Sequence, residues 1–193
     1  MSRIILASGS PRRKELLNQI GIEFEVITST CEENANVQSP GELVKILSMT
    51  KAADVAGRID KNEDDDILII GADTVVVLDN EILGKPSDKQ NAFDILKKLQ
   101  GKIHSVFTGV TLISLRCGKE LFHSFDVETK VKVSSMSDDE IRNYISSGEP
   151  MDKAGAYGIQ GIFAKYIEGI EGDYYNVVGL PVSRLYQELK MFM

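Results

Sequence analysis

The sequence has 193 residues, 42% of them hydrophobic and 26% charged, as is typical of a globular protein that forms one domain, or one domain of two lobes. Its net charge of −7 argues against a nucleic-acid coat protein or a membrane-surface protein, because both classes usually carry excess basic residues. No metal-ligand spacing links the two cysteines and two histidines, so free thiols are expected and a structural zinc site is not.

The first predicted elements are a strand over residues 3–7 and a helix that begins after Ser10-Pro11 and ends near residue 20, where Gly21 stops it. Ser is a favourable N-cap, and Pro suits the first helical position. Gly supplies the left-handed conformation that often ends a helix.

The first turn of this helix carries Arg12, Arg13 and Lys14, although helix N-termini usually attract acidic residues. Three cations beside free N–H groups form a concentrated anion site. At ~100° per residue, Arg13 falls on the apolar arc of the helix. We therefore expect Arg13 to lean inward; the alternative is a solvated, charged turn.

A half-exposed strand is predicted over residues 22–27, followed by a polar loop that contains Glu32 and Glu33. Ser39 and Glu42 have the spacing of a capping box for a helix that runs to about residue 58. Lys51 lies in the middle of the apolar arc of that helix and breaks its pattern. Such a break often marks function, although a lysine can also rest its stem on the core and extend its ammonium to water.

Residues 67–86 (ILIIGADTVVVLDNEILGKP) contain an apolar run that is typical of a strand buried on both faces. Gly71 is expected to end this strand, so that Asp73 lies at the edge where ligands bind in open α/β sheets. A hairpin over residues 75–83 then leads to Lys85. The acid and the lysine either share a pocket or are simply solvated.

The remaining elements alternate between helices and strands. A capping box at residues 87–90 begins a helix to residue 100, residues 104–115 and 121–134 form a hairpin, and Ser137 caps a helix that ends at Gly148. Residues 149–161 (EPMDKAGAYGIQG) form a Gly-rich loop that lets backbone N–H groups approach a ligand closely. A strand over residues 162–167 and a terminal helix with Leu185 and Leu189 complete the pattern.

This order predicts an α/β protein with a mixed twisted sheet flanked by helices, because the interspersed hairpins argue against a pure Rossmann sheet. The residues that break the local patterns combine acids, cations and a Gly-rich loop, without a nucleophilic Cys or a Ser–His pair. Cations and helix N–H groups hold phosphates, carboxylates hold a hard divalent metal, and one carboxylate activates water. The combination favours hydrolysis of a polyphosphate by positioning and charge neutralisation.

The sequence resembles the Maf family of nucleoside triphosphate pyrophosphatases along nearly its whole length. The matching segments are SGSPRR at 8–13, Glu33, Lys51-Ala52, GADT at 71–74, GKP at 84–86, DKAGAYGIQG at 152–161 and GDYYNVVGLP at 172–181. The resemblance implies a single domain over residues 1–193, with the two lobes and central cleft of the inosine-triphosphate pyrophosphatase fold. It also implies hydrolysis of dTTP and UTP to the nucleoside monophosphate and pyrophosphate, with Mg²⁺ or Mn²⁺ as cofactor.

The resemblance further assigns roles to individual residues. Asp73 matches the general base, and Glu33 matches a metal ligand that Asp73 assists, although the short loop leaves Glu32 as the alternative. The positions that match phosphate-binding residues are Arg13, Lys51, Lys85 (counted with Asp73 as catalytic) and Lys153. The positions that match residues for base choice are Arg12, Thr74 and Gln160.

Other readings of the same pocket stay open. The chain could be a non-catalytic nucleotide-binding regulator of cell division, since the family is linked to inhibition of septum formation. It could also prefer other or modified bases. The chain start does not resemble a signal peptide, and no run approaches the ~20 apolar residues of a membrane span. We therefore expect a cytoplasmic enzyme, often dimeric in this family, with a nucleotide substrate and no nucleic-acid or membrane partner.

Overall fold

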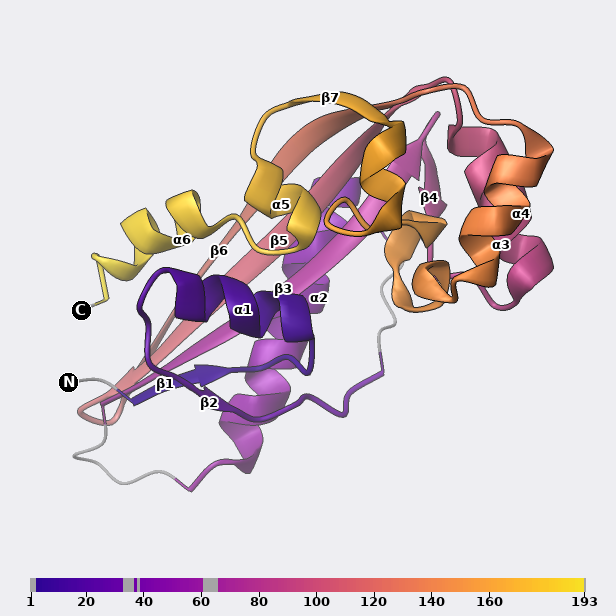
Figure 1. Cartoon of the computed structure of the whole chain (residues 1–193). Coiled ribbons are helices and arrows are strands. Elements are labelled where there is room, and N and C mark those ends of the chain that lie inside the picture. Colours follow the sequence, from indigo (N-terminus) through magenta and orange to yellow (C-terminus); the bar gives the residue numbers. More distant parts are fainter. Residues whose placement is uncertain (1–2, 33–36, 38, 61–65, 193) are drawn as a thin grey trace. The chain divides into compact units, whose positions relative to one another are not determined.

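The computed structural model describes residues 3–32, 37, 39–60 and 66–192. Its helices and strands are interspersed along the chain, with β3–β4 and β5–β6 as consecutive strands (Figure 1). The strands are β1 (Arg3–Leu6), β2 (Glu25–Val26), β3 (Asp66–Leu78), β4 (Glu81–Leu83), β5 (Ile103–Arg116), β6 (Lys119–Val133) and β7 (Ile167–Glu171). The α-helices are α1 (Pro11–Gln19), α2 (Pro40–Arg58), α3 (Lys89–Leu99), α4 (Asp138–Ser146), α5 (Tyr174–Val178) and α6 (Val182–Leu189). Short 3₁₀ turns occupy Glu149–Asp152, Ala154–Ala156 and Ile162–Tyr166.

The strands form a seven-stranded mixed sheet in the order β2-β1-β3-β5-β6-β7, with β4 beside β3. The pairs β1–β2 and β1–β3 are parallel, whereas β3–β4 and β6–β7 are antiparallel. The predicted fold class, an α/β protein with a mixed sheet that includes hairpins, is therefore confirmed. None of the described helices is long and apolar enough to cross a membrane.

The chain divides into two compact units. The first unit comprises Met1–Asp73, Thr108–Val127 and Gly179–Met193, and the second comprises Thr74–Phe107 and Glu128–Val178. Two units agree with the expected two lobes, while the cleft between the lobes and the single domain over residues 1–193 stay predictions. The strand β3 begins in the first unit and ends in the second, with the boundary between Asp73 and Thr74.

In the first unit, α1 and α2 lie on opposite faces of the parallel strands β1 and β3 (Figure 1). This arrangement follows from two right-handed crossovers that run in opposite directions, from β1 through α1 to β2 and from β2 through α2 to β3. The apolar cluster on the α2 side joins Ile5 of β1, Ile67 and Ile69 of β3, and Ala52 and Val55 of α2. Alternate residues of each strand thus pack against one face of α2, so the side chains on that face of the helix point toward the sheet.

Two glycines let α2 approach the sheet closely. A Cβ at Gly71 of β3 would lie 2.2 Å from the carbonyl oxygen of Ser48, and a Cβ at Gly109 of β5 would lie 2.3 Å from that of Val44. The prediction that Gly71 ends a strand is therefore wrong, because β3 continues through Gly71 to Leu78. Its lack of a side chain gives room to a helix backbone.

In the second unit, an aromatic cluster supports the Gly-rich segment. The Phe163 ring contacts Tyr144 of α4, Tyr157 and Tyr166, with centroid separations of 5.0, 4.8 and 5.5 Å. The predicted strand over residues 162–167 is wrong, because Ile162–Tyr166 is a 3₁₀ turn and β7 begins at Ile167. The buried Phe163 and Tyr166 are three residues apart, a spacing that suits a helical turn better than a strand.

Predicted helix boundaries agree within one or two residues, but not every predicted cap forms. Ser137 and Glu140 form the expected capping box of α4. The cap of α3 is Asp88, whose carboxylate accepts the Asn91 N–H at 2.8 Å, and not Ser87. Ser39 occupies the N-cap position of α2, but its side chain makes no capping hydrogen bond among the described residues. The capping box predicted for Ser39 and Glu42 is therefore wrong.

Candidate active site

The carboxyl end of β1 and the part of β3 that continues beyond it define the place where the first unit gathers its polar side chains. Leu6 pairs with Ile70, and the Ala7 N–H donates to the Ile70 carbonyl at 2.8 Å. Beyond this point β1 turns toward α1, while β3 continues to Asp73. The chain thus leaves β1 and approaches β3 from opposite faces, which creates the topological switch point where α/β sheets bind ligands.

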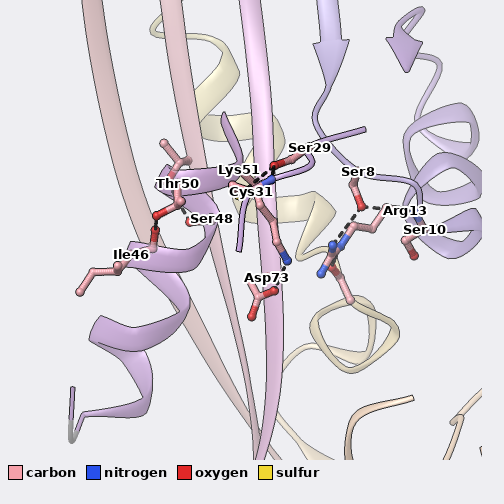
Figure 2. Close-up of polar contacts among 12 residues, drawn as sticks. Ser8, Ser10, Arg13, Ser29, Cys31, Ile46, Ser48, Thr50, Lys51 and Asp73 are labelled. Carbon is pink, nitrogen blue, oxygen red and sulfur yellow. Dashed lines mark hydrogen bonds and ion pairs between the residues drawn. The ribbon is translucent and has the colours of Figure 1, made fainter. Parts of the chain in front are cut away.

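Lys51 and Asp73 form an ion pair at this edge. The Lys51 Nζ donates to Asp73 Oδ1 at 2.5 Å, with 13% and 10% of the two side chains exposed. Figure 2 shows the lysine reaching from α2 to the carboxylate on β3. The inward Lys51 expected from the helical pattern therefore has a buried acidic partner and does not merely extend to water.

The side-chain periodicity of β3 and of α2 explains why Lys51 and Asp73 meet. Ile69, Gly71 and Asp73 alternate onto the α2 face of β3, and Gly71 admits the α2 backbone at Ser48. Lys51 lies three residues farther along the same side of α2. The expectation that Asp73 follows the end of a strand is wrong, because Asp73 lies within β3.

Arg13 turns inward from the first turn of α1, as expected. Its Nη1 donates to Ser8 Oγ at 3.1 Å, and its Nε donates to the Gly179 carbonyl at 2.9 Å. Figure 2 shows the guanidinium directed back toward Ser8 at the end of β1. Arg12 is half-buried on the same turn. The Arg13 charge thus lies at the same edge of the sheet as Asp73, one strand away.

The acidic loop after β2 is described only in part, because Glu33 lies outside the described residues. Glu32 is exposed. The preceding residues are fastened to α2: the Thr30 N–H donates to Asp54 Oδ2 at 2.9 Å, and Arg58 Nη2 donates to the Thr28 carbonyl at 2.8 Å. The Thr30 hydrogen bond, helped by Ser29 and Arg58, lowers the pKa of the Asp54 carboxyl.

The second unit holds the other residues singled out from the sequence. Thr74 is half-buried on β3, and Lys85 is exposed after β4. The Gly84 carbonyl accepts the Gly155 N–H at 3.1 Å, which joins the Lys85 segment to the Gly-rich loop. Gly155 has φ +68°, and a Cβ there would lie 2.9 Å from Val76, so the junction requires glycine.

Lys153 and Gln160 lie on that Gly-rich loop in different settings. The Lys153 ammonium donates to the Glu149 carbonyl and to the Asp152 carboxylate, each at 2.7 Å. Gln160 is exposed in a turn between the buried Ile159 and the exposed Gly161. The phosphate role of Lys153 and the base-reading role of Gln160 stay predictions.

The donor chemistry of Asp73 fits a hard divalent cation, because carboxylate oxygen is the ligand that Mg²⁺ prefers. Nowhere in residues 3–32, 37, 39–60 and 66–192 do three His, Cys, Asp or Glu side chains gather into a metal cluster. This fits Mg²⁺, which is commonly held by one or two carboxylates together with substrate phosphates. Glu33 as a ligand stays a prediction.

Several side chains were not singled out from the sequence. Ser8 orients Arg13, and Asp54 with Arg58 fastens the loop before Glu32. Tyr144 and Glu149 contact the Gln160 turn. Only Ser8 and Glu149 fall in stretches quoted for their pattern; the others meet their partners through tertiary contacts that no local spacing reveals.

Comparison with known proteins extends over the whole chain. A family model described as Maf-like protein matches residues 3–192. A protein of Agathobacter rectalis named dTTP/UTP pyrophosphatase is 54% identical, covering 98% of this chain and 97% of the relative. Proteins of the same name from Dictyoglomus turgidum and a Thermoanaerobacter species are 51% and 48% identical, covering 98% and 97% of this chain and 95% of each relative. Because the family model and these relatives span nearly the full sequence, the chain belongs to the Maf-like protein family.

Proposed function

We propose that this protein hydrolyses dTTP and UTP between the α- and β-phosphates, releasing the nucleoside monophosphate and pyrophosphate. The observation that carries the proposal is the largely buried Lys51–Asp73 pair on β3, just beyond the carboxyl end of the neighbouring β1, with Arg13 close to that same end. The name of the similar proteins, dTTP/UTP pyrophosphatase, supports the choice of substrate. We also propose that the reaction takes place in the cytoplasm.

Asp73 acts as the general base in this proposal. Its carboxylate accepts a proton from the water that attacks phosphorus, a role that requires an ionisable oxygen within hydrogen-bond reach of that water. Proton uptake neutralises the partner of Lys51. The lysine charge is then available to the phosphate oxygens at the moment when negative charge develops on them.

Arg13, Lys51, Lys85 and Lys153 bind the triphosphate oxygens, and Arg12, Thr74 and Gln160 contact the base. The hydrogen bonds of Arg13 to Ser8 and Gly179 hold its guanidinium group in one orientation, which suits bidentate binding of phosphate. Mg²⁺ or Mn²⁺, held by Asp73 and Glu33, would neutralise phosphate charge.

Product analysis tests the reaction. The purified protein is incubated with dTTP and Mg²⁺ in ¹⁸O-labelled water, and both products are analysed by mass spectrometry. We expect equimolar dTMP and pyrophosphate, with ¹⁸O in dTMP if water attacks the α-phosphorus. Orthophosphate as the first product would contradict the proposal. Nucleotide binding without hydrolysis would favour the regulatory reading instead.

The role of Asp73 is tested by Asp73→Asn, which keeps the side-chain volume and removes the base. We expect kcat to fall by about 10²–10⁴-fold, the usual contribution of general-base catalysis. The matched control is Asp79→Asn in the turn that follows β3, where the side chain is exposed and φ is +51°. Asn tolerates that conformation, so turnover should stay at the wild-type level. Near-normal turnover of Asp73→Asn would remove Asp73 as the base.

A further inference from the structure

Gln160 lies at the tip of a tight turn in the second unit. The Gly158 carbonyl accepts the Gly161 N–H at 3.2 Å, so Ile159 and Gln160 are the two central residues of a β-turn. Ile159 is buried and Gln160 is exposed. The turn therefore packs one side chain on the core and presents the amide of the other to its surroundings.

Tyr144 and Glu149 hold both ends of this turn. The Tyr144 hydroxyl accepts the Gly158 N–H at 3.3 Å and donates to Glu149 Oε1 at 2.9 Å. Glu149 Oε2 accepts the Ile162 N–H at 2.9 Å. The hydrogen bonds thus run in series from one side of Gln160 to the other through two side chains outside the turn.

The contact with Glu149 is also steric. A Cβ at Gly161 would lie 2.3 Å from each carboxylate oxygen of Glu149, so the carboxylate packs directly on the turn backbone. Glu149 is held in place by its own backbone, since its N–H donates to Ser147 Oγ at 3.2 Å and its carbonyl accepts the Lys153 ammonium at 2.7 Å. The backbone of Glu149 is therefore anchored outside the turn that its carboxylate contacts.

The Tyr144 hydroxyl has one donor role and one acceptor role in this series of hydrogen bonds. Burial, with a further contribution from the Glu149 hydrogen bond, raises the pKa of its phenol well above the usual value. The hydroxyl stays protonated at neutral pH, so its proton goes to Glu149 and its oxygen accepts from Gly158. The ring packs on Phe163, with centroids 5.0 Å apart, which restricts its rotation.

We propose that Tyr144 and Glu149 are positioning residues that hold the turn of residues 158–161, and thereby set the discrimination between nucleotide bases through Gln160. The inference rests on the proposed function, in which Gln160 contacts the base. A polar group rejects the wrong partner only when its position is fixed, because a mobile amide adapts to either base. Tyr144 and Glu149 supply that fixation through their hydrogen bonds to the two ends of the turn.

The first test is Tyr144→Phe, which keeps the packed ring and removes the hydroxyl. We measure kcat/KM for dTTP and for GTP and compare their ratio with that of the wild type. We expect the ratio to fall about tenfold, a coupling of the size found between residues in one hydrogen-bond network. A merely structural role would lower both values by the same factor, and an unchanged ratio would overturn the proposal.

The matched control is Tyr166→Phe, the same hydroxyl deletion on another ring that packs on Phe163. Its base ratio should equal that of the wild type. In a double-mutant cycle, Tyr144→Phe should change the ratio no further once Gln160→Ala is present, because both act through one amide. Additive effects of the two substitutions would show that Tyr144 does not act through Gln160.

A second readout does not depend on activity. Amide hydrogen exchange at residues 158–162 should be faster in Tyr144→Phe than in the wild type, and unchanged in Tyr166→Phe. Unchanged exchange in Tyr144→Phe would overturn the positioning role whatever the enzyme does. If wild-type protein releases no pyrophosphate from dTTP, the proposed function fails, and the exchange measurement still decides whether this pair holds the turn.

Discussion

His104 is a buried imidazole that the proposed chemistry does not use. It is 2% exposed, and its Nε2 shares a 2.7 Å hydrogen bond with the hydroxyl of the buried Tyr157. Its Nδ1 has no hydrogen-bond partner among the described residues. Burial lowers the pKa of His104 from 6.5 to about 4, because the charged form cannot be solvated. His104 is therefore neutral in the folded protein at neutral pH.

This burial makes stability depend on pH. The unfolded chain binds a proton near pH 6.5 and the folded chain only near pH 4, so the contribution of His104 is complete above pH 6.5 and is lost as the pH falls toward 4. Between pH 7 and pH 5 the loss should be about 2 kcal/mol of unfolding free energy. His104→Gln, which does not titrate, should lack this loss.

Urea unfolding of both proteins at pH 7 and pH 5 measures the difference. Carboxylates that titrate at low pH are common to the two proteins, and any constant effect of the substitution cancels in the comparison. Equal pH dependence of wild type and His104→Gln would show that His104 is protonated as readily when folded as when unfolded.

At the scale of elements, the position of α2 depends on two glycines of the sheet. Gly71→Ala would place a methyl group against the Ser48 carbonyl, a fixed backbone atom. We expect a loss of about 1–3 kcal/mol of unfolding free energy from overpacking. We also expect a large loss of turnover, because the displaced helix would carry Lys51 away from Asp73.

The matched control is Gly57→Ala on α2 itself, where a Cβ would meet no atom within 4 Å. Removal of a helical glycine there should stabilise the protein by about 0.5–1 kcal/mol. Thermal unfolding of both variants should therefore show a lower melting temperature for Gly71→Ala and a higher one for Gly57→Ala. A Gly71→Ala protein as stable as the wild type would show that α2 does not need this close approach.

The elements were largely predictable because their signals are local. Helix periodicity placed Arg13 and Lys51 on inner faces, and the Ser137 capping box fixed the start of α4. The prediction for Gly71 is wrong because a glycine that ends a strand and one that makes room for a helix look alike in sequence. Residues 162–167 were misread because a short apolar run fits a strand or a 3₁₀ turn.

The site was predictable only as a set of residues, and not as a set of contacts. The Lys51–Asp73 pair joins residues 22 positions apart, and the pattern indicated an inward lysine without naming its partner. No local pattern singles out Tyr144, because its hydrogen bond to Gly158 forms only when α4 and the Gly-rich loop fold together. Roles in phosphate, base and metal binding came from the family resemblance.

At the scale of the whole molecule, both compact units are assembled from separated parts of the chain. The last part of the first unit, Gly179–Met193, carries Leu185 and Leu189 of α6, both fully buried, and the Gly179 carbonyl that binds Arg13. The terminal helix is therefore a structural part of the unit that also contains β1 and β3. We expect the first unit to depend on it for stability.

A protein truncated after Val178 tests this expectation. Because each large buried side chain contributes about 2–5 kcal/mol, the truncated chain should lose amide exchange protection in β1 and in the first half of β3. Truncation after Lys190 is the matched control, since it keeps α6 and removes the exposed Met191. Wild-type protection after the longer deletion would show that the first unit folds without its last segment.

The interleaving of the two units also has a consequence for how such a protein diversifies. The chain passes between the units after residues 73, 107, 127 and 178, so no contiguous gene segment encodes either unit. A single recombination event within residues 74–178 would break both units, and exchange of one whole unit would require a junction at each passage. We therefore expect a new base preference to arise by point substitutions around positions such as Thr74 and Gln160, and not by shuffling of a cassette.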